Sequence, residues 1–162
     1  MKTAIIYASK YGTTEKVAHL IAESLKEIGE VSLISLAKKS TENINSYDKV
    51  ILGTSVYAGS SSRKMKLFCI ENQDVLLQKP LGLFVCGMEP SEEKRQLEIQ
   101  NAYPDYLLEK AQAATFLGGE FLFEKMNFLE KMIIKKIAKT TTSVSNIDYA
   151  EIQAFAGKMK GE

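Results

Sequence analysis

The chain has 162 residues, of which 45% are hydrophobic and 25% charged, and these proportions are typical of one globular domain, residues 1–162. Its formal net charge of +1 argues against a nucleic-acid-binding protein and against an acidic carrier steered to basic partners. The single histidine, and two cysteines without metal-ligand spacing (Cys69 and Cys86), argue against a metal site.

The chain opens with a nearly continuous apolar segment, Thr3–Ala8, which is typical of a central strand covered on both faces. A turn of small and polar residues follows, and a helical pattern starts at Thr13. Gly12 lets the turn come close to a ligand, and the helix directs its unpaired N–H groups and positive dipole end at the same point. Hydroxyl groups stand there at Ser9, Tyr11, Thr13 and Thr14. The turn predicts a phosphate site; an ordinary strand-to-helix turn capped by hydroxyls is the alternative.

The helix that starts at Thr13 is predicted to end at Gly29, a residue type common at helix C-termini. Its core face, at the helical period, is formed by Val17, Leu20, Ile21, Leu25 and Ile28. His19 lies on the opposite, polar side, so we interpret it as an exposed helix histidine; a catalytic base is the alternative.

Strands and helices alternate along the rest of the chain. Further strands are predicted at Val31–Leu36, Asp48–Gly53, Leu81–Cys86 and Thr115–Glu120. Helices are predicted after Ser60–Ser62, across Ser91–Ala114 and from Asp148, where Glu151 completes a capping box. The polar stretch Ala37–Ser46 is predicted as a loop or a short helix.

This alternation predicts a three-layer α/β fold, with a five-stranded parallel sheet of strand order 2-1-3-4-5 between two layers of helices. In this order the ligand crevice lies at the carboxyl ends of strands 1 and 3. The turn Ser9–Thr14 follows strand 1, the loop Thr54–Gly59 follows strand 3, and the loop Cys86–Glu89 follows strand 4. We therefore expect three loops with binding chemistry at one edge of one sheet.

These three loops differ in what they can bind. The first offers hydroxyls, backbone N–H groups and a helix dipole, with Lys10 as its nearby cation. The other two offer exposed backbone and apolar groups that can hold a flat aromatic ligand. A ligand with a phosphate at one end and a planar redox ring at the other is FMN. The predicted FMN-binding residues are Ser9, Lys10, Tyr11, Gly12, Thr13, Thr14, Thr54, Ser55, Val56, Tyr57, Ala58, Gly59, Cys86, Gly87, Met88 and Glu89.

Three segments, Met1–Ala18, Tyr47–Phe68 and Phe116–Lys139, resemble the flavodoxin-domain family that includes the menaquinone-dependent protoporphyrinogen oxidases. The resemblance runs over essentially the whole length. It implies a flavodoxin-like fold, with the FMN phosphate at Ser9–Thr14 and the two later loops on either side of the isoalloxazine ring. Electron-carrier flavodoxins are similar in fold but are usually strongly acidic and often flank the flavin with Trp, whereas this chain is charge-balanced and has no Trp.

The resemblance implies an FMN-dependent oxidoreductase, in which a reduced substrate such as a protoporphyrinogen delivers electrons that a quinone or a redox protein removes. A non-enzymatic electron carrier of the flavodoxin type is the alternative. A flavin-free receiver domain ranks last, because Thr54 stands where a receiver needs a phosphorylatable aspartate. We assign no catalytic residue, since the nearest acid, Glu89, is interpreted as a solvated loop carboxylate.

The segment Phe121–Lys139 is dense in apolar and basic residues. A helical stripe is predicted at Leu122, Met126, Leu129, Ile133 and Ile137, widened by Phe128, Met132 and Ile134. Three interpretations stay open: a helix on a membrane surface, a lid over the flavin, or a helix packed on the sheet or across a homodimer. The sequence contains no membrane-spanning run or leader pattern, so we expect a soluble, cytoplasmic protein.

Overall fold

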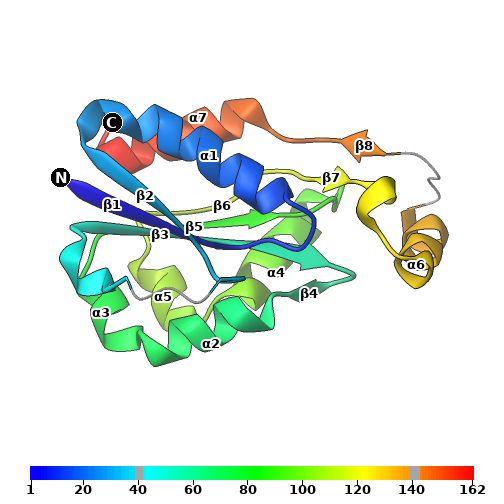
Figure 1. Ribbon diagram of the computed structural model, residues 1–162, viewed down its shortest axis with the longest axis horizontal. Coiled ribbons are helices and arrows are strands. Elements are labelled where there is room, and N and C mark those ends of the chain that lie inside the picture. The colour runs from blue at the N-terminus through cyan, green and yellow to red at the C-terminus, as the bar shows by residue number, and fades with distance from the viewer. Residues whose placement is uncertain (39–41, 139–142) are drawn as a thin grey trace.

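Five strands form one parallel sheet in the order β2-β1-β3-β5-β6, which confirms the predicted order 2-1-3-4-5 (Figure 1). Their bounds are Lys2–Ala8 for β1, Glu30–Ser35 for β2, Lys49–Tyr57 for β3, Leu81–Cys86 for β5 and Ala113–Phe116 for β6. The computed structural model describes residues 1–38, 42–138 and 143–162, so the predicted loop Ala37–Ser46 lies partly outside these ranges.

The interior strand β1, which pairs with β2 and β3, is buried on both faces, as its continuous apolar sequence predicts. Ile5 and Tyr7 pack in the core on one face of the sheet, whereas Ala4 and Ile6 pack in the core on the other. Because successive side chains of a strand point to opposite faces, one apolar run contributes to both cores. The turn that follows β1 is therefore anchored in the middle of the domain.

Helices cover both faces of the sheet (Figure 1). One face carries α1 (Thr13–Leu25) and α7 (Tyr149–Lys160); the other carries α2 (Arg63–Glu71), α3 (Gln73–Leu77), α4 (Glu92–Ala102) and α5 (Asp105–Lys110). Two short 3-10 helices, η1 (Lys26–Ile28) and η2 (Ile44–Ser46), lie in the connections. The core face of α1 is buried at Val17, Ile21 and Leu25, and the interpretation of His19 as an exposed residue is confirmed.

The last helix, α7, is capped where the sequence predicts. Asp148 Oδ1 accepts a hydrogen bond of 3.0 Å from the Glu151 N–H, an N-cap contact that stabilises a helix by about 1 kcal/mol. Phe155 and Met159 of α7 are buried against the same face of the sheet as α1. The end of the chain is thereby fixed to the main body.

The prediction of a loop at Thr54–Gly59 is wrong for its first four residues. Thr54–Tyr57 continue β3, whose last two residues pair antiparallel with the short strand β4 (Ser60–Ser61). The turn between them is Ala58–Gly59, with φ of 49° and 76°, values suited to a two-residue hairpin. The small residues of this hairpin do not indicate a strand from the sequence alone. Because β3 extends this far, Tyr57 lies on a strand and not in a loop.

The last strand of the sheet, β6, begins and ends earlier than the predicted strand Thr115–Glu120. It starts at Ala113, inside the region predicted as the helix Ser91–Ala114, which also divides into α4 and α5. Gly118 accounts for the early end, because its φ is 76° and a Cβ there would lie 2.0 Å from the Asn146 carbonyl oxygen. The chain leaves the sheet at this close approach.

Residues 120–138, which we call the edge segment, lie beyond the carboxyl ends of the strands and not against a face of the sheet (Figure 1). They form β7 (Glu120–Phe121), the 3-10 helix η3 (Phe123–Lys125) and the helix α6 (Phe128–Ala138). The strand β7 pairs with β8 (Val144–Ser145) in a separate two-stranded sheet. This position argues against the interpretation of the segment as a helix packed on the main sheet.

The stripe predicted in the edge segment does not form one buried face. Met126 and Ile134 are buried, whereas Leu129 and Ile133 are exposed. The helical period is correct, but the face that turns inward is a different one, because α6 meets only the sheet edge. The side chains of Ile137 and Lys139 lie outside the described part of the structure.

Candidate functional site

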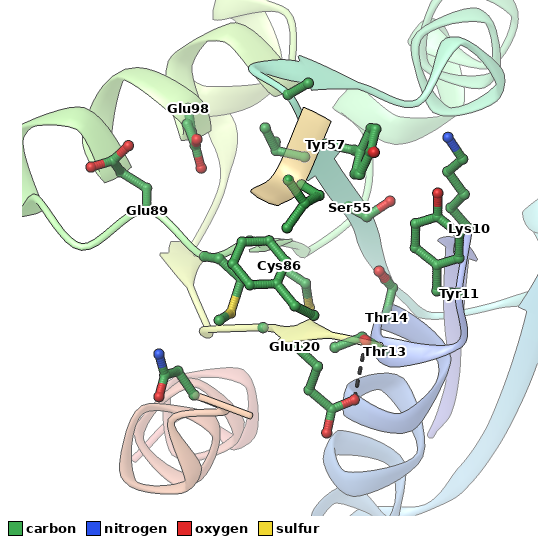
Figure 2. A pocket seen from close by; sticks show the side chains of 18 of the residues that line it. Lys10, Tyr11, Thr13, Thr14, Ser55, Tyr57, Cys86, Glu89, Glu98 and Glu120 are labelled. Atoms are coloured by element: carbon green, nitrogen blue, oxygen red, sulfur yellow. Dashed lines mark hydrogen bonds between the residues drawn. The ribbon is translucent and has the colours of Figure 1, made fainter. Parts of the chain in front are cut away.

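A cavity of about 660 Å³ opens at the carboxyl edge of the sheet (Figure 2). This volume falls within the roughly 300–1,000 Å³ of small-molecule sites. Every predicted FMN-binding residue lines it except Gly12 and Thr54. The further lining residues are Pro90, Lys94, Glu98, Gly119, Glu120, Phe121, Met126, Ile134, Val144 and Asn146. The structure thus brings the three predicted loops together and adds the edge segment to them.

The two exceptions have structural roles. Gly12 precedes α1 with a left-handed φ of 96°, and its N–H donates a hydrogen bond of 3.0 Å to Ser9 Oγ. Thr54 is fully buried in β3, where its Oγ1 accepts a hydrogen bond of 3.4 Å from the Ser62 N–H. Gly12 therefore shapes the turn Ser9–Thr14, and Thr54 holds the β3–β4 hairpin.

The Thr14 hydroxyl has unused hydrogen-bonding capacity at the cavity wall. The residue is 1% exposed, and its Oγ1 has no regular hydrogen-bond partner in the described part of the chain. Its polar neighbour is the Cys86 thiol, a weak hydrogen-bonding group. A buried polar group in this state costs roughly 1–3 kcal/mol. A ligand oxygen bound by this hydroxyl and by the free N–H groups at the start of α1 would remove that cost.

A carboxylate stands beside the turn Ser9–Thr14. Glu120 accepts hydrogen bonds of 3.1 Å from Thr13 Oγ1, 3.0 Å from Lys16 Nζ and 3.0 Å from Ser145 Oγ. Burial alone would raise the pKa of Glu120, but these three donors and the Lys16 charge bring it below its ordinary value. The start of α1 is therefore already in contact with one negative group, which pairs with Lys16.

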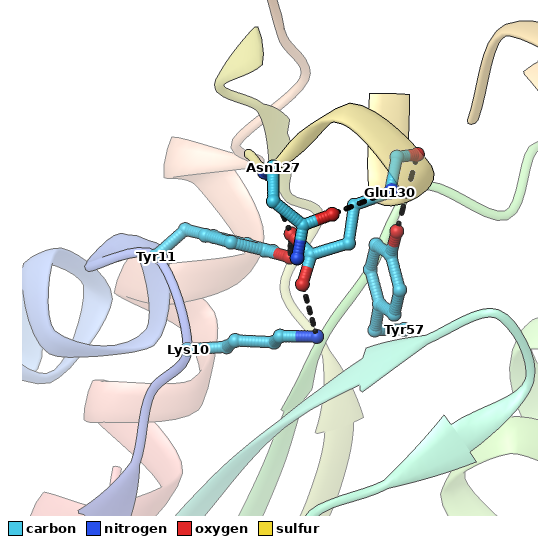
Figure 3. Close-up of polar contacts among 5 residues, drawn as sticks. All are labelled: Lys10, Tyr11, Tyr57, Asn127 and Glu130. Atoms are coloured by element: carbon cyan, nitrogen blue, oxygen red, sulfur yellow. Dashed lines mark hydrogen bonds and ion pairs between the residues drawn. The ribbon is translucent and has the colours of Figure 1, made fainter. Parts of the chain in front are cut away.

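Glu130 of α6 contacts the turn Ser9–Thr14 and the segment Thr54–Gly59, the first two of the three predicted binding loops (Figure 3). Its carboxylate accepts a hydrogen bond from the Tyr11 hydroxyl and pairs with Lys10 Nζ at 3.0 Å. Its backbone carbonyl accepts a hydrogen bond of 3.4 Å from the Tyr57 hydroxyl. Its own N–H donates to Asn127 Oδ1 at 2.9 Å at the start of the helix. One residue therefore holds α6 against the two loops.

These contacts shift the proton affinities of the groups involved. Burial, followed by the hydrogen bond to Glu130, raises the pKa of Tyr11 well above its ordinary value. Burial and the Glu130 charge raise the pKa of Tyr57. The Tyr11 hydroxyl is the main cause of a lowered pKa at Glu130. Lys10 Nζ also lies 4.3 Å from the Tyr57 ring centroid, a cation–π contact. At neutral pH the cluster thus contains two neutral phenols and one carboxylate.

The cavity wall near α4 carries two groups whose pKa burial raises. Burial raises the pKa of the Cys86 thiol to about 12. Glu98 has a buried Oε2 without a hydrogen-bond partner among the described residues, and burial, with the charge of Glu89, raises its pKa. This wall therefore offers a protonated thiol and a poorly solvated carboxyl group and carries no strong nucleophile.

The sequence analysis included a lid over the flavin among its interpretations of this segment, but it did not identify Glu120 or Glu130 as site residues. Glu120 and Glu130 engage the phosphate-type turn from more than 100 positions away, and Met126 and Ile134 close one side of the cavity. One signal was available in the helix: Glu130 is the only acid in the sequence of α6, which otherwise carries lysines. An isolated acid in a basic helix is a reasonable candidate for a paired, inward position.

Two classes of feature are absent from the described residues. No helix among them is long and apolar enough to cross a membrane. No group of three or more histidine, cysteine or acidic side chains among them could hold a metal ion.

The fold and the cavity together define a class of protein: a doubly wound α/β domain with its ligand crevice at the point where the strand order reverses, between β1 and β3. Residues 4–148 match the family described as flavodoxin domain, and the chain belongs to this family.

The chain is similar in sequence to an enzyme and to a flavodoxin. The chain is 21% identical to protoporphyrinogen IX dehydrogenase [quinone] of Escherichia coli (strain K12), over 96% of this chain and 93% of the relative. It is 36% identical to a flavodoxin of Clostridium saccharobutylicum, over 51% and 52% of the two chains. Among solved structures, the Fusobacterium nucleatum flavodoxin bound to flavin mononucleotide superposes with a TM-score of 0.52 at 14% identity, covering 99% of this chain and 97% of the other.

Proposed function

We propose that this chain binds FMN in the cavity at the carboxyl edge of the sheet and acts as an FMN-dependent oxidoreductase. The observation that carries the proposal is the Thr14 hydroxyl, buried and without a regular partner among the described residues, at the N-terminus of α1. Membership of the flavodoxin-domain family supports the same cofactor.

Different residues of the cavity bind different parts of the cofactor. The turn Ser9–Thr14 takes the phosphate, through hydroxyls and the N–H groups that open α1. Tyr57 and Met88 line the part of the cavity left for a planar ring. FMN supplies the electron-transfer chemistry, and the protein supplies binding, orientation and exclusion of water.

A comparison of FMN with riboflavin tests this assignment. Riboflavin has the same ring but lacks the phosphate, so quenching of flavin fluorescence should show much tighter binding of FMN. A charge-assisted hydrogen bond contributes roughly 1.5–3 kcal/mol, so we expect at least a tenfold difference in Kd. Equal affinities would place the phosphate elsewhere, and no binding of either flavin would contradict the proposal altogether.

The enzyme is favoured over a simple carrier by the enclosure of the cavity. Phe121, Met126 and Ile134 of the edge segment add an apolar wall beside the expected ring, which suits an apolar substrate. By analogy with the quinone-linked Escherichia coli relative, we propose that a quinone or a redox protein removes the electrons. The buried free thiols Cys69 and Cys86 fit a reducing, cytoplasmic setting.

The alternative is a non-enzymatic electron carrier, as in the named flavodoxin relative. Stepwise reduction of the FMN-loaded protein, followed by absorbance, separates the two. A single spectral transition favours the oxidoreductase, because both electrons are then added together. Two resolved transitions favour the carrier.

A further inference from the structure

The helix α6 presents an apolar face to solvent. Phe128 is 74% exposed, Leu129 70%, Met132 54% and Ile133 43%, values that exclude a role in the core of the domain. The opposite face carries Glu130 and Ile134, four residues apart and turned toward the cavity. The apolar face is thus directed outward because Glu130 fixes the rotation of the helix.

The charged residues on the outer side of α6 are all positive. Lys135 and Lys136 are exposed beside the four apolar side chains, and Lys131 is half-buried at the margin of this side. The single acid of the α6 sequence, Glu130, is used inward, in its contacts with Lys10 and Tyr11. The protein as a whole is nearly neutral, at +1, so the outer side of α6 is a local concentration of positive charge and apolar surface.

We propose that this outer side, Phe128, Leu129, Met132 and Ile133 with the three lysines, docks on an anionic lipid surface. A helix that lies in a membrane interface combines an exposed apolar face with lysines, and it needs negative lipid headgroups for charge complementarity. The helix stands at the far end of the molecule from both termini and beyond the carboxyl ends of the strands (Figure 1).

The observations fit a lipid surface better than a protein. A stable protein interface uses about 20–30 residues on each side, and this patch has seven. A symmetric contact with a second copy would bring lysines against lysines. A bilayer needs neither a complementary shape nor a large patch, because the apolar side chains enter the headgroup region individually.

This inference does not depend on FMN. Flotation of the full chain with vesicles of phosphatidylglycerol and phosphatidylcholine tests it, with and without added FMN. We expect binding at low salt that weakens at high salt, and little binding to vesicles of phosphatidylcholine alone. Lys135→Glu/Lys136→Glu should lower the partition coefficient at least about 25-fold, at roughly fivefold per lysine. Phe128→Ser/Leu129→Ser should lower it about tenfold or more.

A matched control is available on another helix. Leu67 and Ile70 of α2 are 45% and 63% exposed and lie beside lysines, so Leu67→Ser/Ile70→Ser removes similar apolar surface elsewhere. Vesicle binding should survive this change, and circular dichroism should show all three variants folded. The proposal is overturned if the chain does not bind anionic vesicles at low salt. It is also overturned if the α6 variants bind as well as the parent chain, or if they instead abolish a dimer seen in solution.

Discussion

Two regions line the same cavity, and they are held in place in different ways. The turn Ser9–Thr14 lies between a strand buried on both faces and a helix with a fully buried core face. The edge segment lies beyond the sheet and meets this turn through the carboxylates of Glu120 and Glu130 and the ammonium group of Lys125, which donates to the Tyr11 carbonyl at 3.2 Å. The first region is fixed mainly by packing, whereas the second combines these polar contacts with the burial of Met126 and Ile134.

We therefore expect the turn to determine how a ligand is bound and the edge segment to determine how it reaches the cavity. Packing of buried apolar groups depends little on pH and on moderate salt, so the turn Ser9–Thr14 should keep its shape under most conditions. Ion pairs near the surface contribute only about 0–1 kcal/mol each and are screened by salt. The edge segment is therefore the part that can open, and the predictions below probe each side of this contrast.

The largest effect is expected at Thr14. Thr14→Val removes the hydroxyl proposed to bind the phosphate, so FMN binding should weaken by about 1.5–3 kcal/mol, at least tenfold in Kd. Riboflavin binding should hardly change. Since the hydroxyl is buried without a regular partner among the described residues, unfolding stability should not fall. Flavin fluorescence titration and thermal denaturation measure both quantities.

Thr54→Val is the matched control for this prediction. Thr54 is equally buried, but its hydroxyl is bonded within the β3–β4 hairpin and does not line the cavity. This variant should lose about 1 kcal/mol of stability, the net value of one hydrogen bond, with FMN affinity nearly unchanged. A larger loss of FMN binding at Thr54 than at Thr14 would contradict the assignment.

The contrast also explains what the sequence could predict. The strand order and the first loop follow from local signals: a continuous apolar run, a glycine, hydroxyls and a helical period. The β3–β4 hairpin was missed because Ser60–Ser61 carry no strand signal, and pairing depends on the φ values of Ala58 and Gly59. Glu120 and Glu130 were missed because their contacts join positions more than 100 residues apart, which no local pattern encodes.

The next effect is expected at Glu120, which places a carboxylate beside the proposed phosphate. Glu120→Gln removes that negative charge and frees Lys16 from its 3.0 Å pair. The phosphate should then bind more tightly by about 1 kcal/mol, roughly fivefold in Kd, which is the Coulomb energy of two unit charges about 4 Å apart in water. Riboflavin, which has no phosphate, should show no such gain, and a gain for both flavins would assign the effect to the cavity shape instead.

A smaller effect is expected at Glu130. Glu130→Gln removes the ion pair with Lys10, and an exposed pair is worth at most about 1 kcal/mol. The edge segment should open up to about fivefold more often, which limited trypsin digestion at its lysines can measure. Glu27→Gln, which breaks the exposed pair with Lys160 at 2.9 Å, is the control and should leave that cleavage rate unchanged.

The smallest effect is expected from moderate acidification. The pKa of Glu130 is lowered from its ordinary value of 4.5, chiefly by the Tyr11 hydroxyl, and that of Glu120 is lowered mainly through Lys16. A carboxylate with a lowered pKa stabilises the closed segment fully above its ordinary pKa and loses this effect only as the pH falls through the lowered value. Hydrogen exchange of residues 121–138, corrected for the intrinsic rate, should therefore be constant from pH 7 to pH 5 and should rise below about pH 4.5. In Glu120→Gln/Glu130→Gln that rise should disappear; a rise near pH 6 in the parent chain would show that another group controls the segment.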